Sequence, residues 1–284
     1  MDASRDAVVI LNIRGGIISA NHSFTAICGF IPIELIGRSM NVLFSPKHHD
    51  RDFLENIWST LKHIGYWEGE LWHQHKGGED FPISMGISEV RDQTGSVHNY
   101  VCIYTDITEQ KRKEHDLNKL AHHDTLTGLP NRKLFNDRLM VALSSAQRDN
   151  SRMALIFMDL DGFKPINDRL GHQVGDVVLK TVAKRLENSV RDSDTPARLG
   201  GDEFAVILPG IDKNENLEAV AEKILHRIME PMEIKGEILS VGTSMGISLF
   251  PEHAKDKESM IKYADEAMYA AKKSGKGRWQ YYSS

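Results

Sequence analysis

Long apolar runs are missing from this sequence of 284 residues, and so is any excess of positive charge. No stretch is apolar over the length needed to cross a bilayer, and residues 1–6 lack the apolar core of a secretory signal peptide. The formal net charge is -5 and basic residues are scattered, which argues against a nucleic-acid binder that depends on neutralising phosphates. We therefore expect a soluble, cytoplasmic protein with no membrane segment and no nucleic-acid partner.

Cysteine is scarce as well, with two in the whole chain. Cys28 lies in an apolar helical pattern and Cys102 in an apolar strand pattern, so we expect buried thiols in a reducing compartment and no disulfide framework. Hydrophobic residues make up 40% of the sequence, enough for a sizeable core, and the length suggests two domains.

The first half alternates short strand and helix patterns and ends in three longer strands. We predict strands at 7–11 and 16–19, helical pieces at 24–30 and 32–36, an amphipathic helix at 52–63, and antiparallel strands at 67–74, 81–91 and 97–106. In the amphipathic helix, Phe53, Ile57 and Leu61 share one face at helical spacing.

This half resembles a PAS domain. The likeness rests on residues 6–9, 36–38, 65–72, 76–82 and the closing Asp-Ile-Thr at 106–108. It implies an antiparallel sheet with flanking helices over residues 1–108, acting as a sensor or a dimerisation module. The sequence does not identify the PAS ligand.

Two histidines, Cys28 and three tryptophans are the candidate signs of a PAS cofactor. His48 or His49 could be haem ligands, but histidines at a surface or at the start of a helix are commoner, and we favour this interpretation. Cys28 lacks the surroundings of a flavin photosite. The tryptophans are expected in core and interface rather than in a cofactor cage; they are Trp58, Trp67 and Trp72.

Residues 108–123 contain no glycine or proline and predict a continuous connecting helix, to which we assign 109–123. One helical stripe carries Ile107, Glu114, Leu117 and Leu120. Two interpretations stay open: a solvated spacer, or a short two-stranded coiled coil that holds two copies together.

The second half predicts a buried strand that ends in carboxylates. A loop at 124–132 and a helix at 134–147 precede an apolar run at 153–158, which is typical of a central strand. The run ends in Asp159-Leu160-Asp161, and carboxylates there are costly unless they meet a metal or a partner. Ligands commonly dock at this edge of an α/β sheet.

Two turns and two helices follow that could bind a nucleotide. Lys164 and the N–H groups at 162–168 could lie near phosphates. Polar side chains near the helix that starts at about 171–176 could contact a base, although Asp176 as the helix cap is an equal alternative; they are Asn167, His172 and Asp176. A strand at 240–248 and a helix at 264–273 follow. Lys272 and Lys276 could reach a triphosphate, or only stabilise a helix C-terminus.

A tight hairpin is predicted where Gly200-Gly201 joins strands at 197–199 and 204–208. It presents Asp202 and Glu203 as exposed carboxylates, which alone could be a solvated acidic turn. Just before it, Arg191 and Asp194 form an Arg-x-x-Asp pair.

From about Asp124 to its end the chain closely resembles the GGDEF-family diguanylate cyclases. The likeness rests on four ordered segments, residues 124–132, 159–168, 200–204 (Gly-Gly-Asp-Glu-Phe) and 264–272. The resemblance implies a ferredoxin-like domain over 124–284, similar to nucleotidyl cyclases and polymerase palms. The whole chain is then expected to be an α+β protein of two domains.

The family's reaction is implied to condense two GTP molecules into cyclic di-GMP and two pyrophosphates. By matching positions, Asp159, the Leu160 carbonyl and Asp202 would hold Mg²⁺ or Mn²⁺, with Asp159 and Asp202 catalytic and Asp202 the base. Asn167 and Asp176 would read guanine and His172 would contact substrate. The phosphates would be lined by Phe163, Lys164, Lys272 and Lys276, the last standing where the family more often has arginine. Arg278 could compensate for this change.

Regulation and assembly are implied in the same way. Arg191 and Asp194 match the inhibitory site that binds product, the alternative being a surface salt bridge. Since each domain would carry one GTP site, the resemblance implies a homodimer. Two other functions stay open: a catalytically silent receptor for GTP or cyclic di-GMP, and a fragment of a bifunctional cyclase-phosphodiesterase.

Overall fold

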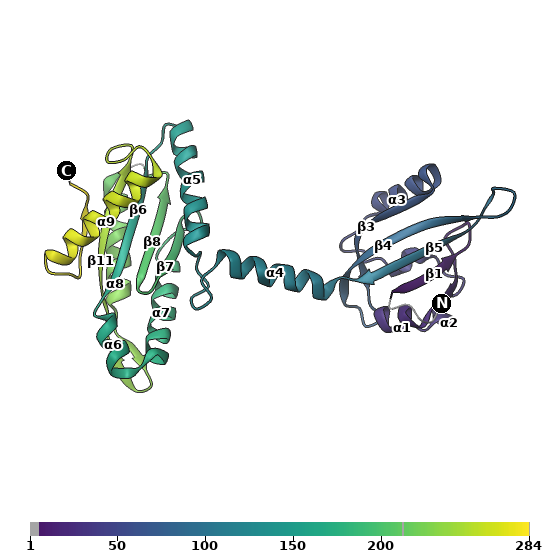
Figure 1. Ribbon diagram of the computed structural model, residues 1–284, viewed down its shortest axis with the longest axis horizontal. Coiled ribbons are helices and arrows are strands. Elements are labelled where there is room, and N and C mark those ends of the chain that lie inside the picture. Colours follow the sequence, from purple (N-terminus) through teal and green to yellow (C-terminus); the bar gives the residue numbers. More distant parts are fainter. Residues whose placement is uncertain (1–5, 212, 284) are drawn as a thin grey trace. The chain divides into compact units, whose positions relative to one another are not determined.

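The computed structural model describes residues 6–211 and 213–283, and its chain forms two compact units that divide between Asp116 and Leu117 (Figure 1). The signal-peptide prediction for residues 1–6 therefore falls largely outside the described residues, as does the start of the predicted unit 1–108. In the part of the chain that is described, no helix is both long and apolar enough to span a membrane.

The first unit is one antiparallel sheet in the order β2-β1-β5-β4-β3. Its strands are β1 (Ala7–Leu11), β2 (Ile17–Ala20), β3 (Tyr66–Gln74), β4 (Asp80–Arg91) and β5 (Val97–Asp106). Between β2 and β3 lie α1 (His22–Cys28), α2 (Pro32–Leu35), the 3-10 helix η1 (Met40–Leu43) and α3 (Arg51–Ile64). The predicted order of elements is confirmed.

Helix α3 illustrates how local sequence defines these elements. The Asp50 side chain accepts the N–H of Phe53 and caps the first turn, and Gly65 ends the helix at a φ of 87°. Ile57 and Leu61 are buried, as their spacing predicted.

Both cysteines are free and buried, as predicted. Burial raises the pKa of the Cys28 and Cys102 thiols to about 12, so neither is ionised near neutral pH.

The histidines and tryptophans that were weighed as cofactor residues lie among aromatic neighbours. His48 stacks on Trp72, and His49 stacks on Phe53 and accepts the N–H of Trp72 at 2.7 Å. Trp58 and Trp67 pack against the core.

The linking helix α4 (Thr108–His122) is continuous, as predicted, and buries none of its residues. Leu117 and Leu120 are exposed. The Lys111 ammonium lies 2.7 Å from Glu70 on β3 and ties the first turn of α4 to the sheet. Ile107 was expected on the same stripe, but it precedes the helix and is buried.

The second unit is a five-stranded sheet in the order β12-β11-β6-β8-β7, with β6 (Met153–Asp161) in the centre (Figure 1). The others are β7 (Thr195–Gly200), β8 (Glu203–Pro209), β11 (Gly242–Phe250) and β12 (Trp279–Tyr281). A separate hairpin joins β9 (Met232–Ile234) to β10 (Glu237–Leu239). The apolar run at 153–158 is buried on both faces, as predicted.

Helices cover both faces of this sheet. One core cluster holds residues of α6 (Phe163–Leu170), α7 (His172–Glu187) and α8 (Asn214–Met229) with alternate strand residues, such as Ile156 and Val206. The other holds α5 (Arg132–Arg148) and α9 (Lys257–Lys273) with the intervening ones, such as Leu155 and Ile207. The alternation of strand side chains thus divides the core into two layers.

The titratable side chain of His73 is buried in the first unit, and its burial opposes protonation. His73 on β3 is fully buried, rings of Phe44, Phe81 and Tyr104 meet it edge-on, and neither ring nitrogen has a hydrogen-bond partner among the described residues. Burial lowers the pKa of His73 to about 3, so the folded unit holds the neutral imidazole.

Acid should therefore destabilise the first unit through His73. The unfolded chain takes up a proton on this histidine below its ordinary pKa of 6.5, whereas the folded unit takes it up only near 3, so stability falls as pH drops between these values. Between about pH 7.5 and about pH 5, His73 should remove about 2 kcal/mol from the free energy of unfolding. Three of the four tryptophans lie in this unit, so urea unfolding followed by tryptophan fluorescence measures it.

We expect His73→Phe to lose about 2 kcal/mol of this pH dependence, because phenylalanine suits the aromatic surroundings and carries no proton. Replacement of the exposed His98 by Gln is the matched control and should leave the dependence as in the wild type. Equal pH dependence in His73→Phe and the wild type would contradict the assignment.

Candidate active site

The centre of the candidate site is the end of β6, beside the β7–β8 hairpin. Asp159 pairs in register with Glu203 on β8, and the Leu160 N–H donates to the Asp202 carbonyl at 3.3 Å. These contacts bring Asp159 and Asp202 to one edge of the sheet, where the negative charge of Asp202 acts on Asp159. Asp202 and Glu203 are half-buried, whereas the sequence predicted exposed carboxylates.

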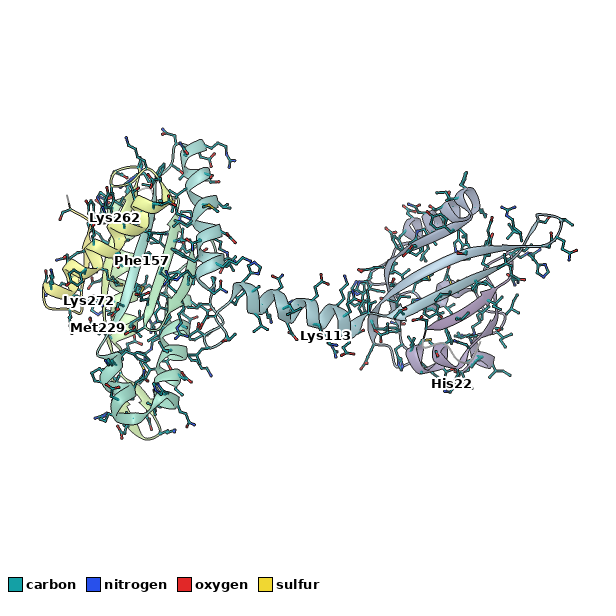
Figure 2. The ribbon with its side chains drawn as sticks, viewed as in Figure 1. His22, Lys113, Phe157, Met229, Lys262 and Lys272 are labelled. Carbon is teal, nitrogen blue, oxygen red and sulfur yellow. The ribbon has the colours of Figure 1, made fainter. Side chains whose placement is uncertain are left out.

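Asp159 meets a lysine at this edge. Figure 2 labels Lys272, in the last turn of α9, and its Nζ lies 2.7 Å from Asp159 Oδ2. The side chains are 29% and 17% exposed. Burial raises the pKa of Asp159, the Lys272 hydrogen bond opposes this, and the nearby charges of Asp202 and Asp161 add to the rise, so the net pKa lies above its ordinary value.

Asp161, two residues further on, has a structural role instead. Its carboxylate accepts the Ser244 hydroxyl at 3.0 and 2.9 Å and the Gly277 N–H at 3.1 Å. It therefore joins β6 to β11 and to the turn after α9. The sequence predicted that the carboxylates here need a partner but did not identify this one.

Arg198 on β7 holds the Gly200-Gly201 turn and joins it to Asp124, which lies outside the hairpin. The two glycines have φ of 145° and 53°, which L side chains rarely adopt. Arg198 donates from Nε and Nη2 to the Gly201 carbonyl at 3.0 and 2.7 Å, and its Nη1 lies 2.9 Å from Asp124 Oδ1. A more exposed pair, Arg132 with Glu203 at 3.3 Å, lies beside it.

Asp124 belongs to the loop that follows the linking helix. Burial would raise its pKa, but hydrogen bonds from Thr127 and Arg198 outweigh burial and hold the pKa below its ordinary value. The carboxylate is therefore ionised at neutral pH, and it pairs with Arg198, whose side chain is only 10% exposed.

The junction between α6 and α7 gathers the predicted base-reading residues. Gly171, with a φ of 83°, occupies the cap position of α7, so the alternative that Asp176 caps this helix is wrong. His172 and Asp176 are exposed and one helical turn apart. Asn167 lies against Gly175, where an added Cβ would meet its Oδ1 at 1.7 Å. This Oδ1 is buried and has no hydrogen-bond partner among the described residues.

The predicted phosphate residues come from two helix ends. Gly162, with a φ of 81°, precedes α6, where Phe163 is buried and Lys164 exposed. Lys276 is exposed in the turn after α9, with a φ of 61°, and Arg278 Nε donates to its carbonyl at 3.4 Å.

Arg191 and Asp194 lie at the other end of the hairpin, before β7. The Asp194 carboxylate accepts the Arg191 backbone N–H at 2.8 Å, and the Asp194 N–H donates to the Arg191 carbonyl at 3.0 Å. Asp194 thus contacts the backbone of Arg191, and not its guanidinium as in the salt bridge that was the alternative in the sequence analysis. Both residues line a small hollow with Pro209, Gly210 and Asn216.

A divalent cation fits the donors at the sheet edge. The two carboxylates of Asp159 and Asp202 and the Leu160 carbonyl are all oxygen ligands, which suit a hard cation that keeps several waters. Among the described residues there is no group of three or more His, Cys, Asp or Glu that could hold a metal by itself.

Two models of known protein families match the sequence of this chain. The family model described as "Diguanylate cyclase, GGDEF domain" matches residues 121–278, and a PAS domain model matches residues 5–109. The chain belongs to the GGDEF family and carries a PAS domain ahead of its GGDEF domain. The predicted fold class is thereby confirmed.

Individual relatives match different shares of the chain. It is 44% identical over 158 residues to the diguanylate cyclase TpbB of Pseudomonas aeruginosa, covering 55% of this chain and 36% of that protein. It is 33% identical over 277 residues to the cyclic di-GMP phosphodiesterase PdeR of Escherichia coli, covering 97% and 41%. The chain thus spans less than half the length of these relatives.

Solved structures match the second unit. A structure of TpbB comprising only the GGDEF domain superposes with a TM-score of 0.56 at 42% identity, covering 57% of this chain and 95% of that one. The coiled coil and GGDEF domain of DgcB from Caulobacter crescentus, in complex with c-di-GMP, gives 0.56 at 28% identity, covering 62% and 93%.

Replacement of Arg198 by Ala should destabilise the second unit. It removes the counter-charge of the part-buried Asp124 carboxylate, which keeps only its Thr127 donors, and it removes the donor to the Gly201 carbonyl, so we expect a loss of about 3 kcal/mol in the free energy of unfolding. Arg132→Ala removes a more exposed pair and is the control, with a loss of about 1 kcal/mol or less. Urea unfolding followed by far-UV circular dichroism measures both, and equal losses would contradict the special position of Arg198.

Proposed function

We propose that this chain is a diguanylate cyclase, which joins two GTP molecules into cyclic di-GMP and releases two pyrophosphates. The observation that carries the proposal is the placement of Asp159 and Asp202 at one sheet edge, with Lys272 and the α6–α7 junction presenting polar groups nearby. The name of TpbB, the diguanylate cyclase that matches 55% of the chain, supports it.

Asp159, Asp202 and the Leu160 carbonyl would hold Mg²⁺ or Mn²⁺. When bound, the cation supplies neutralising charge for the phosphate oxygens and lowers the pKa of the attacking hydroxyl. In each half-reaction the 3′ oxygen of one nucleotide forms a bond to the α-phosphorus of the other, and the bond from that phosphorus to the bridging oxygen of pyrophosphate breaks. The Asp202 carboxylate is the proposed acceptor of the hydroxyl proton.

Guanine recognition is proposed for Asn167 and Asp176, with His172 also contacting the substrate. The Asn167 Oδ1 is a buried acceptor without a partner among the described residues, and such atoms usually meet a donor in native proteins. Guanine N–H groups are donors of the right kind. The exposed Asp176 carboxylate can accept in the same way.

Phosphate binding is proposed for Phe163, Lys164, Lys272 and Lys276. Residues 163 and 164 open α6, where backbone N–H groups are free to meet an anion. Lys272 and Lys276 add positive charge from the end of α9. As a lysine, Lys276 offers a point charge in place of arginine's planar fork, so its contact should be less directional.

Two copies are proposed to face each other, because one chain carries one set of these residues. The exposed Leu117 and Leu120 on α4 are the proposed contact of a short two-stranded coiled coil. The domain limits that we propose are 1–108 for the PAS sensor, 109–123 for the linking helix and 124–284 for the cyclase.

Product inhibition is proposed at Arg191 and Asp194. The Arg191 guanidinium can pair with guanine through two hydrogen bonds, and Asp194 can accept from its N–H groups. Asp194 is only 9% exposed and held by the backbone, so its carboxylate is already oriented.

A second candidate is that the chain is part of a longer protein that also degrades cyclic di-GMP. PdeR, named a cyclic di-GMP phosphodiesterase, matches 97% of this chain with 41% of its own length. In that case the chain would keep the cyclase site described above or act as a silent receptor for GTP or cyclic di-GMP.

The cyclase assay tests these candidates. We expect cyclic di-GMP from GTP and Mg²⁺, measured by chromatography, and a rate at least about 100-fold lower for Asp202→Asn, because a metal ligand and the proposed base are both lost. Asp137→Asn, which removes an exposed carboxylate of α5 outside the site, is the matched control and should keep the wild-type rate. No product from the wild type, at concentrations where the chain dimerises, would overturn the proposal and favour the receptor.

Product inhibition has its own test. Arg191→Ala should raise at least about tenfold the cyclic di-GMP concentration that halves the rate, because one two-bond contact to guanine is lost. Asp192→Asn, at the exposed position between the two residues, is the control and should leave that concentration unchanged. Unchanged inhibition in Arg191→Ala would place the product elsewhere.

A further inference from the structure

Lys272 has a second possible partner besides the phosphates, and the structure records it. Its ammonium lies 2.7 Å from Asp159 Oδ2, and both side chains are largely buried. Asp159 is also the carboxylate proposed to hold the divalent cation. Two cations, the lysine ammonium and the metal, therefore compete for the Asp159 carboxylate.

The lysine and the metal oppose each other at close range. An ammonium and a divalent cation repel, and the repulsion is strong where side chains are shielded from water. The carboxylates of Asp202 and Asp161 lie close enough to act on Asp159, so Lys272 neutralises part of a concentrated negative charge. Metal binding then requires Lys272 to move or to share the oxygen.

We propose that Lys272 is an internal counter-ion of Asp159 that the nucleotide triphosphate draws away, so that nucleotide binding frees the carboxylate for the metal. This inference rests on the proposed function. It makes the metal and the nucleotide bind cooperatively through one side chain, in addition to direct contacts between them.

The side chain and its helix are suited to such a change of partner. A lysine carries its charge on a flexible four-carbon stem, so the ammonium can move while the backbone stays fixed. Helix α9 is anchored by the buried Met268 and Ala271. Lys272 is in the last turn, and the loop beyond it contains Gly275 and Gly277 at positive φ.

Lys276 provides a matched comparison. It carries the same charge, is proposed to contact the same phosphates and lies four residues further along, but it is exposed in the turn. Its replacement should weaken nucleotide binding without changing the affinity of the metal alone.

The test measures Mn²⁺ binding by electron paramagnetic resonance, first without nucleotide. Lys272→Met and Lys272→Gln should bind Mn²⁺ about tenfold more tightly than the wild type, because the competing charge is gone. Lys276→Met should match the wild type, and Asp159→Asn should bind more weakly, which shows that the signal reports this site. Circular dichroism selects the folded variant, and either Lys272 variant suffices.

The second arm adds the α,β-methylene analogue of GTP, which cannot release pyrophosphate. The analogue should strengthen Mn²⁺ binding more in the wild type than in the Lys272 variants, because in the variants the carboxylate is already free. Equal or weaker Mn²⁺ affinity in folded Lys272 variants without nucleotide would overturn the inference, even if the wild type makes cyclic di-GMP. Conversely, a wild type that makes no cyclic di-GMP would overturn the proposed function but leave this binding result valid.

Discussion

The geometry of the candidate site depends on the hydrogen bonds and the ion pair that the Arg198 guanidinium makes. The guanidinium joins Asp124, in the loop after the linking helix, to the carbonyl of Gly201, the residue before Asp202. The same loop is bonded to the end of α4, because Asn131 donates from Nδ2 to the Ala121 carbonyl and from its N–H to the His122 carbonyl. A continuous set of hydrogen bonds thus runs from the linking helix to the turn that carries the candidate base. Arginine suits this position because its fork reaches a carboxylate and a carbonyl at once.

Carboxylates at the end of a buried strand lose hydration free energy, and two different kinds of partner compensate Asp161 and Asp159 for this loss. Asp161 is satisfied by a hydroxyl and a backbone N–H, which are fixed parts of β11 and the turn after α9. Asp159 is satisfied by the ammonium of Lys272, on a mobile stem. A fixed partner makes the first carboxylate structural, and an exchangeable partner leaves the second available to a metal. The two aspartates are similar in sequence, and their partners separate their roles.

Periodic patterns predicted most of the fold, since β6, α3, α4 and the Gly200-Gly201 hairpin have strong local signals. No comparable local signal marks α8, whose cap position, Lys213, makes no side-chain hydrogen bond, or the three-residue β12. Site residues such as His172, Asp176 and Lys276 lie outside the four motifs, whereas the motifs themselves include Asp159, Asn167, Asp202 and Lys272. The motifs could not separate Asp161 from Asp159, because Ser244 and Gly277 are 83 and 116 residues away in the sequence. Likewise, the burial of His73 and the pairing of Asp159 with Lys272 depend on tertiary contacts, which local sequence does not reveal.

The proposed reaction needs two copies of one site, so it can be controlled away from that site. Every proposed metal and nucleotide residue lies in the second unit, yet a single second unit holds only one set of them. The pairing of two chains is the remaining requirement of this proposal, and α4 is the proposed contact. Its first turn is tied to the sheet of the first unit by Lys111 and Glu70, and its second half exposes Leu117 and Leu120. In the proposed dimer, a change in the sheet that breaks the contact of Lys111 with Glu70 would act on the helix that carries these leucines. Control would then act on the pairing of sites while each site keeps its own geometry.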